Sequence, residues 1–273
     1  MSGPGRAALR VAAGPVADRP VAAEPRGTDP PGEERPMAQH EAAGPAGAGP
    51  GRLTSRPGPA RTPSPPPRST TEGLVRLPLP SRQPPLLLVP GAAEGPRPLV
   101  VFFHGAGGHG QGSLGSVEAV AAERGLLVLL PTSAGATWDL VTGPPGQDVA
   151  ALDLALAEVF SAYDVDRVAF AGFSDGGSYA LSIGLANGDL GEAVLAFSPG
   201  FAAPPSQVGA PRVFVAHGDA DAVLPVARCG RRVARTLDGA GYDVRYEEFA
   251  GGHVVPPRLV DAAVDWWLAD AGG

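Results

Sequence analysis

Residues 167–181 read Arg-Val-Ala-Phe-Ala-Gly-Phe-Ser-Asp-Gly-Gly-Ser-Tyr-Ala-Leu. The apolar residues 168–170 predict a buried strand, because β-branched and aromatic side chains suit a strand covered on both faces. Gly172-Phe173-Ser174-Asp175-Gly176 then fits the pattern G-x-S-x-G, in which the serine lies on a strained turn between a strand and a helix. Glycines two residues either side of Ser174 are needed because a Cβ there would collide with neighbouring backbone. The stretch therefore predicts a nucleophilic serine with an exposed hydroxyl.

The pentapeptide alone is weak evidence in a chain that contains 39 glycines. Three further polar clusters make it stronger, since each follows a stretch that predicts a strand: His104-Gly105-Ala106-Gly107-Gly108, His217-Gly218-Asp219-Ala220-Asp221 and Gly251-Gly252-His253. Ligands of parallel α/β sheets bind at the carboxyl ends of the strands. Together with Ser174, these clusters predict one site at that edge.

The chain order of serine, acid and histidine is the order that catalytic triads take on such a scaffold. Ser174 is the expected nucleophile and needs a base within hydrogen-bond reach, for which we expect His253. Asp219 and Asp221 compete as the acid that orients the imidazole. We favour Asp221 because it lies further into its loop, just before residues 222–225.

Backbone N–H groups are the expected donors to a negatively charged tetrahedral intermediate. The glycines after His104 would let the backbone approach this intermediate closely, so we expect donors at Ala106 and Gly107. The N–H of Asp175, directly after the nucleophile, is the expected third donor. The sequence therefore predicts an oxyanion hole made of Ala106, Gly107 and Asp175.

Other polar and aromatic residues have more ordinary interpretations. We expect His104 to pack beneath the oxyanion loop and His217 to order its own turn. Asp148 is expected to cap the N-terminus of a helix. Trp138 could either line an acyl pocket or pack in the core, and the side chain of Asp175 is expected in solvent or near the mouth of the site.

Predicted strands alternate with predicted helices along most of the chain. We expect strands at 74–79, 85–89, 98–103, 126–130, 168–170, 193–197, 212–216 and 242–249, and helices at 116–124, 148–162, after Ser174, at 226–239 and at 257–268. This alternation predicts a mostly parallel α/β sheet with helices on both faces, opened by an antiparallel pair. Residues 132–146 are expected to form a loop, and the segment 198–212 is too short for a large lid.

Composition divides the chain in two. Residues 1–72 contain 15 prolines and 10 glycines and few large apolar residues, so we predict a disordered segment. Residues 73–273 are then one catalytic domain. The first part carries 9 Arg against 7 acidic residues (+2) and the second 12 Arg against 21 (−9), which gives the total of −7. The acidic domain argues against nucleic acid as a partner.

Several functional classes are disfavoured by composition. The chain has no lysine, which excludes a lysine Schiff base, and its one cysteine, Cys229, cannot form an internal disulfide. We expect no metal site, because no histidine or carboxylate cluster has ligand spacing, and no cofactor. No apolar run is long enough for a transmembrane helix, and no segment has the quality of a signal peptide. The expected location is therefore cytoplasmic.

The four motifs together resemble those of the α/β-hydrolase superfamily, over roughly residues 73–271. More narrowly, they are similar to its phospholipase/carboxylesterase branch, akin to polyhydroxybutyrate-depolymerase-like and feruloyl-esterase-like proteins. This resemblance implies the α/β-hydrolase fold, with Ser174 as nucleophile, Asp221 as acid and His253 as base. In the family the acid precedes a Val-Pro-like pair, which supports Asp221 over Asp219. The N-terminal 72 residues are a departure that the family does not require.

The predicted function is that of a serine esterase, which cleaves carboxylic esters of small molecules through an acyl-enzyme intermediate. A peptidase or thioesterase with the same triad remains open, because the leaving group is not written in these motifs. A catalytically silent hydrolase fold that serves as a binding module is a further alternative. The proline-rich residues 63–67 could also be a ligand for another protein. Neither the natural ester nor the oligomeric state follows from the sequence.

Overall fold

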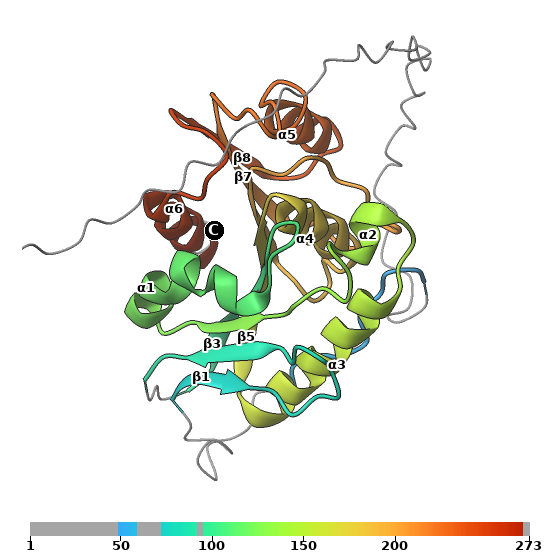
Figure 1. Ribbon diagram of the computed structural model, residues 1–273, viewed down its shortest axis with the longest axis vertical. Helices are drawn as coiled ribbons and strands as arrows, with labels where there is room; N and C mark the ends of the chain where they lie inside the picture. The colour runs from blue at the N-terminus through green and yellow to red at the C-terminus, as the bar shows by residue number, and fades with distance from the viewer. Residues whose placement is uncertain (1–48, 59–71, 92–94, 270–273) are drawn as a thin grey trace, which may run out of the picture. The chain divides into compact units, whose positions relative to one another are not determined.

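The protein is described here by a computed structural model, which covers residues 49–58, 72–91 and 95–269 (Figure 1). These residues form one open sheet and its surrounding helices. The strands are β1 (Gly73–Arg76), β2 (Leu86–Val89), β3 (Arg97–Phe103), β4 (Leu127–Leu130), β5 (Val165–Phe173), β6 (Ala193–Phe197), β7 (Arg212–Gly218) and β8 (Val244–Phe249). The helices are η1 (Gly110–Ser113), α1 (Leu114–Arg124), α2 (Asp139–Thr142), α3 (Gln147–Ala162), α4 (Asp175–Ala186), α5 (Gly230–Gly239) and α6 (Pro257–Leu268).

The sheet has the strand order β1-β2-β4-β3-β5-β6-β7-β8. β2 pairs antiparallel with β1 and β4, and every pair from β4 to β8 is parallel. In this register Phe103 of β3 lies opposite Gly172 of β5, and Phe173 lies opposite Phe197 of β6. The ends of β3 and β6 therefore flank the turn that holds Ser174.

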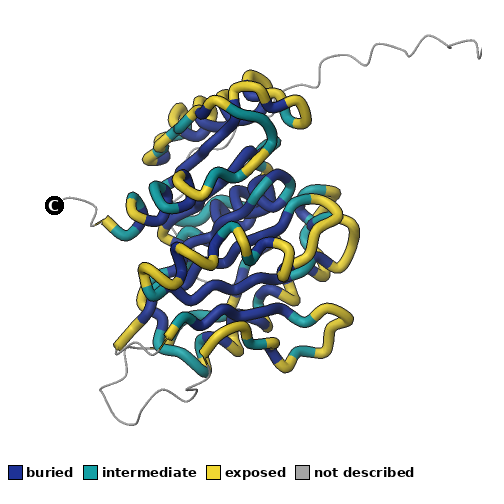
Figure 2. The backbone as a smooth tube through the Cα atoms, turned by 60° about the vertical axis from the view of Figure 1, so that its left-hand side comes forward, coloured by how far each residue is buried: buried dark blue, intermediate teal, exposed yellow. Residues whose placement is uncertain are grey.

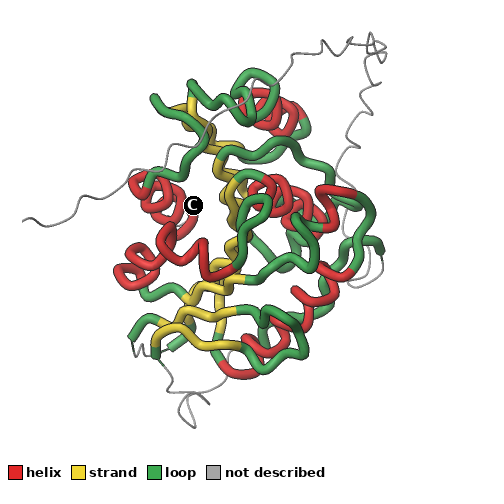
Figure 3. The backbone as a smooth tube through the Cα atoms, in the orientation of Figure 1, coloured by secondary structure: helices red, strands yellow, loops and turns green. Residues whose placement is uncertain are grey.

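Helices cover both faces of the sheet, as expected for parallel strands (Figure 3). On one face the buried side chains of α1 and α6 pack with Phe102 and Phe197, and on the other those of α3, α4 and α5 pack with Phe103 and Phe170. The central strands are buried along most of their length, and the exposed residues lie in loops and on outer helix surfaces (Figure 2). The sheet and its two layers of helices therefore fix the strand ends rigidly.

The fold predicted from the sequence is confirmed, and α6 has the predicted bounds, 257–268. Gly125 ends α1 with a φ of +66°, a left-handed conformation that favours glycine. Several elements differ from the prediction: β1 ends at Arg76 rather than at residue 79, β5 covers Val165–Phe173 rather than 168–170, α5 begins at Gly230 rather than at residue 226, and the expected loop 132–146 contains the short helix α2. None of the helices within the described residues is long and apolar enough to cross a membrane.

The structure differs from the prediction of disorder at residues 49–58, here called the strap. Most of the predicted disordered segment lies outside the described residues, but the strap packs against the domain. Leu53 is completely buried in the core cluster of α3 and α4. Its backbone N–H donates to the Asn187 side-chain oxygen at 2.8 Å, and the Asn187 amide donates to the carbonyl of Gly51 at 2.9 Å. The strap therefore continues the core.

Ion pairs and hydrogen bonds anchor both sides of the strap. Arg52 and Arg56 each contact Asp189, with nitrogen–oxygen distances of 2.7 Å. Burial alone would raise the pKa of Asp189, but the hydrogen bonds from these two guanidinium groups outweigh it and lower the pKa to about 2. The backbone N–H groups of Thr54 and Ser55 donate to the carboxylate of Asp153 on α3. The strap thus connects α3 to the end of α4.

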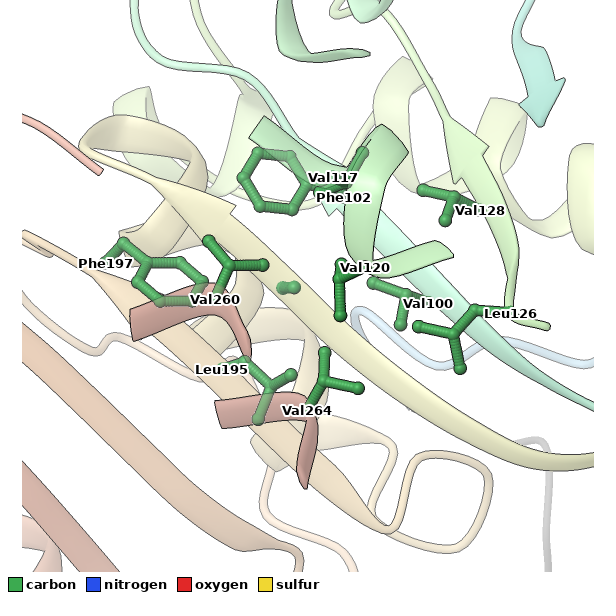
Figure 4. A pocket seen from close by; sticks show the side chains of 11 residues that line it. Val100, Phe102, Val117, Val120, Leu126, Val128, Leu195, Phe197, Val260 and Val264 are labelled. Carbon is green, nitrogen blue, oxygen red and sulfur yellow. The ribbon is translucent and has the colours of Figure 1, made fainter. Parts of the chain in front are cut away.

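A small cavity lies between the sheet and the helices α1 and α6 (Figure 4). Its volume of about 10 Å³ is no larger than one water molecule needs. Apolar side chains line it, among them Val100, Phe102, Val117, Leu195 and Val260. We interpret it as a packing defect of the core and not as a ligand site.

Candidate active site

Ser174 lies on the tight turn between β5 and α4, as the sequence predicts. Its φ of +58° and ψ of −121° are a strained conformation for a residue other than glycine. A Cβ at Gly172 would lie 2.3 Å from the carbonyl oxygen of Gly176, and one at Gly176 would lie 2.1 Å from that of Phe103. The two glycines are therefore required because the turn is pressed against its own backbone and against β3.

Ser174, His253 and Asp221 are connected by two hydrogen bonds. The Ser174 Oγ lies 2.9 Å from His253 Nε2, and His253 Nδ1 lies 2.7 Å from Asp221 Oδ2. Because a carboxylate only accepts, Nδ1 carries the hydrogen and Nε2 is free to accept the serine proton. The ring of Phe173 packs on the imidazole with a centroid distance of 4.7 Å. The three side chains predicted from sequence are thus brought together with the polarity that general-base catalysis requires.

Asp221 lies in the loop after β7, with its side chain fully buried. Its Oδ1 accepts the backbone N–H groups of Val223 at 2.9 Å and Leu224 at 2.8 Å, while Oδ2 faces His253. Burial raises the pKa of this carboxyl group, but the hydrogen bonds from Leu224, His253 and Val223 outweigh burial and lower it. Asp221 is therefore an ionised acid held in one orientation.

Asp219, the competing candidate, has a different contact. Its Oδ1 accepts the backbone N–H of Gly251 at 3.0 Å, two residues before His253. The N–H of Ala220 also donates to the carbonyl of Gly251 at 2.9 Å. Asp219 therefore ties the loop of the base to the loop of the acid, and only Asp221 reaches the imidazole.

The expected oxyanion donors differ in availability. Ala106 is exposed and its N–H has no hydrogen-bond partner within the described residues, and Asp175 begins α4. Gly105, the residue before Ala106, lies against the serine, since a Cβ added to it would be 3.4 Å from the Cβ of Ser174. The prediction that Gly107 is an oxyanion donor is wrong, because its N–H donates to the carbonyl of Ala136 at 2.7 Å and is not free for a substrate. The glycine instead turns the loop, with a φ of +68°.

His104 lies beneath the oxyanion loop, as the sequence predicts. Its Nε2 accepts the N–H of Ser133 at 3.1 Å, so Nδ1 carries the hydrogen and donates to the carbonyl of Gly105 at 2.7 Å. Burial lowers the pKa of this imidazole, which favours the neutral form. His104 therefore joins the oxyanion loop to the loop that follows β4.

Trp138 packs in the core, with 2% of its surface exposed. Its ring stacks on Tyr179 at a centroid distance of 4.8 Å and contacts the ring of Phe103 edge-on at 5.1 Å. The indole N–H donates to the carbonyl of His104 at 2.8 Å. Trp138 therefore supports the oxyanion loop from inside the protein.

Residues of the loop 132–146 make hydrogen bonds to Asp175 and Asp148 that were not predicted from the sequence. Thr137 donates its hydroxyl to the Asp175 side chain at 2.8 Å, so that side chain is not free in solvent. Asp148 does not cap its own helix: it accepts the N–H groups of Ala134 at 2.7 Å and Asp139 at 2.8 Å. Burial raises the pKa of Asp148. The only sequence signal for these roles is the clustering of Asp, Ser and Thr in one loop, which also fits an ordinary turn.

Within residues 49–58, 72–91 and 95–269, no three His, Cys, Asp or Glu side chains are grouped so that they could hold a metal ion. Cys229 is buried, and burial raises the pKa of its thiol.

Comparisons with known proteins place this geometry in context. No family model matches the sequence. A curated relative is acyl-protein thioesterase 1 of Gibberella zeae, 34% identical over 119 residues, which cover 40% of this chain and 50% of that protein. The chain thus matches half the length of this relative.

Solved structures are similar over a larger part of the chain. Esterase PE8 is 22% identical, with a TM-score of 0.52 over 71% of this chain and 97% of its own. The fluorophosphonate-binding serine hydrolase FphF of Staphylococcus aureus is 15% identical, with a TM-score of 0.59 over 73% of this chain and 100% of its own. Est1E of Butyrivibrio proteoclasticus is 17% identical, with a TM-score of 0.54 over 72% and 98%. The sheet order, the strained serine turn and these similarities show that the chain has the α/β-hydrolase fold.

Proposed function

We propose that the protein is a serine hydrolase that cleaves carboxylic esters of small molecules through an acyl-enzyme intermediate. The observation that carries this proposal is the continuous hydrogen-bonded line from Ser174 through His253 to Asp221, with distances of 2.9 and 2.7 Å. The catalytic domain comprises the sheet, its helices and the strap.

The first half of the reaction acylates the serine. The Ser174 Oγ attacks the ester carbonyl carbon while its proton moves to His253 Nε2. The carbonyl becomes an oxyanion, for which the N–H groups of Ala106 and Asp175 are the donors. The positive end of α4 points at the same place. When the C–O bond breaks, His253 returns the proton to the departing alcohol, and an ester of Ser174 remains.

The second half repeats these steps with water. His253 Nε2 takes a proton from the water molecule, whose oxygen attacks the acyl carbon. The new oxyanion collapses, the bond to Ser174 Oγ breaks, and the serine recovers its proton from His253. Asp221 stays ionised throughout and stabilises the imidazolium in both halves. The products are a carboxylic acid and an alcohol, and the enzyme is regenerated.

Thioester hydrolysis is a second candidate function. It is favoured by the match to a curated acyl-protein thioesterase at 34% identity. The same acyl-enzyme would form, with a thiol in place of an alcohol as the leaving group. The two functions share every residue in the mechanism above and differ only in the leaving group.

The test compares oxygen esters and thioesters of the same acyl chain. p-Nitrophenyl acetate, butyrate and octanoate are assayed beside acetyl, butyryl and octanoyl thioesters, with wild type, Ser174→Ala and Ser161→Ala. Ser161 is an exposed serine on α3, so its variant is the matched control. We expect Ser174→Ala to lose at least about 10³-fold in kcat/KM and Ser161→Ala to equal wild type. Equal rates for Ser174→Ala and wild type would contradict the proposal, and the preferred series decides between ester and thioester.

A further inference from the structure

His217 is a buried histidine to which the mechanism above gives no role. It lies near the carboxyl end of β7, one residue before Gly218, and none of its side chain is exposed. A histidine next to a catalytic loop is more than a filler of space, because its ring nitrogens must be accounted for when they are buried.

The hydrogen-bond geometry of the ring assigns its tautomer. His217 Nε2 lies 2.8 Å from the carbonyl oxygen of Leu224 and 3.2 Å from Asp221 Oδ2. Both neighbours are acceptors, so Nε2 carries the hydrogen. Nδ1 has no hydrogen-bond partner among the described residues. The single N–H of the ring therefore points at the loop 221–224, which holds the catalytic acid.

Two histidines consequently meet at one carboxylate oxygen. Asp221 Oδ2 receives the Nδ1–H of His253 at 2.7 Å and lies 3.2 Å from His217 Nε2 on another side. His217 also holds the loop 221–224 in its conformation. Its Nε2–H is donated to the carbonyl of Leu224, and the N–H of the same Leu224 is donated to Asp221 Oδ1. We propose that His217 is a positioning residue of the proposed reaction, which fixes the Asp221 loop and moderates the pull of the carboxylate on His253.

The start of α5 holds the ring of His217 in this position. A Cβ at Gly230 would lie 2.6 Å from His217 Nδ1 and 2.7 Å from its Cβ and Cγ. The ring is therefore clamped between α5 on one side and the Asp221 loop on the other. Gly230 gives a second way to disturb the histidine, by pushing the ring without removing it.

The experiment compares two substitutions of His217 in the full chain. His217→Leu fills similar space but removes the donor, and His217→Gln keeps an N–H at a similar reach. We expect His217→Leu to lower kcat about 10–100-fold, a range taken over from outer-shell hydrogen-bond partners that orient metal ligands, with KM little changed. We expect His217→Gln to recover most of this loss.

The pH profile separates positioning from simple stability. Without the N–H beside it, the Asp221 carboxylate attracts the His253 imidazolium more strongly. The acid limb of the kcat/KM profile should therefore move to higher pH in His217→Leu, by up to about one pH unit. A role in stability alone would lower the folded fraction and leave the limb where it is. An unmoved limb, or one at lower pH, overturns the proposal.

Gly230→Ala and Gly239→Ala test the proposal independently, in case His217→Leu does not fold. Both glycines belong to α5, but a Cβ at Gly239 meets nothing within 4 Å. We expect Gly230→Ala to lower kcat and shift the acid limb, and Gly239→Ala to match wild type. If Gly230→Ala is folded and fully active with an unshifted limb, the proposal is wrong.

The proposed function and the positioning role can fail separately. Absence of Ser174-dependent turnover in the wild type would remove the proposed function. In that case the imidazole nitrogen NMR signals of His253, followed against pH in wild type and His217→Leu, still test whether His217 acts on the Asp221–His253 pair. Superimposable titrations would overturn the positioning role without reference to any substrate.

Discussion

The two ends of α4 show how differently one helix can be fixed in the same protein. Its N-terminus carries Ser174, held by short glycine-rich motifs at the ends of β3, β5, β7 and β8. Its C-terminus is followed by Asn187, which is held by backbone groups of the strap, and by Asp189, which is held by two of its arginine side chains. We expect the first end to determine activity and the second end to determine stability. The helix of 12 residues separates them by roughly 18 Å.

The largest expected effect lies at the catalytic end. Asp221→Asn should lower kcat about 10⁴-fold, because an amide cannot hold the required tautomer of His253. This loss is equivalent to about 5.5 kcal/mol. Asp219→Asn keeps an oxygen that can accept the Gly251 N–H and should lose less than about tenfold. Steady-state kinetics on both variants checks the assignment, and a larger loss for Asp219→Asn would reverse it.

The next effect belongs to the strap. Removal of residues 1–58 deletes the buried Leu53 and strands the buried amide of Asn187, so it should lower the free energy of unfolding by about 3–5 kcal/mol. Removal of residues 1–48 leaves the strap in place and should cost less than about 1 kcal/mol. Urea unfolding of the two truncations measures the difference. If the chain without residues 1–58 is still folded but has also lost its kcat, the two ends of α4 do not have separate roles.

Gly176→Ala should lower kcat. Expressed as a free energy, this loss should be similar to the loss of stability on strap removal or somewhat smaller. The added Cβ would lie 2.1 Å from the carbonyl oxygen of Phe103, so the turn must shift by about 1 Å, and such a shift can cost about 10²-fold in kcat. Gly115→Ala on α1 is the control, since a Cβ there meets nothing within 4 Å. Full activity of Gly176→Ala would show that the turn is looser than its contacts indicate.

The smallest effect is a pH dependence of the strap. The pKa of Asp189 is lowered to about 2 by Arg52 and Arg56, below its unfolded value of 3.8. Its contribution is therefore complete above about pH 4 and lost as pH falls toward 2. We expect a loss of about 1 kcal/mol, since the pair is partly solvated. Asp189→Asn should abolish this part of the pH dependence, and unfolding curves at pH 5, 4 and 3 would show a constant difference if the idea is wrong.

The catalytic end could be predicted from the sequence because each of its parts is a local pattern. Buried strands are apolar runs, and the residues that follow them in parallel strands must meet at one edge. Ser174, His253 and Asp221 were found in this way. Asp221 was favoured over Asp219 by its place in the loop and by the family resemblance, and it is the Asp221 carboxylate that contacts the His253 ring.

The strap could not be predicted because no local pattern describes it. Leu53 is a single large apolar residue among prolines and glycines, and the side chain it needs, Asn187, is 134 residues away in the sequence. The role of Gly107 was predicted wrongly for a similar reason, since the partner of its N–H is Ala136 in another loop. Contacts between irregular segments follow from tertiary packing alone.

The hydrogen bonds between the loop of Asp221 and the loop of His253 have a consequence for how activity is lost. β7 and β8 are neighbours, and Gly218 is so close to Gly251 that a Cβ there would lie 2.4 Å from the Gly251 carbonyl oxygen. The loops of Asp221 and His253 are thus bound to each other, whereas Ser174 is held between β5 and α4. The joint between them consists of the 2.9 Å contact between Ser174 and His253 and the packing of the Phe173 ring on the imidazole. In mild denaturant this joint should open first, so that activity declines before the helical signal does.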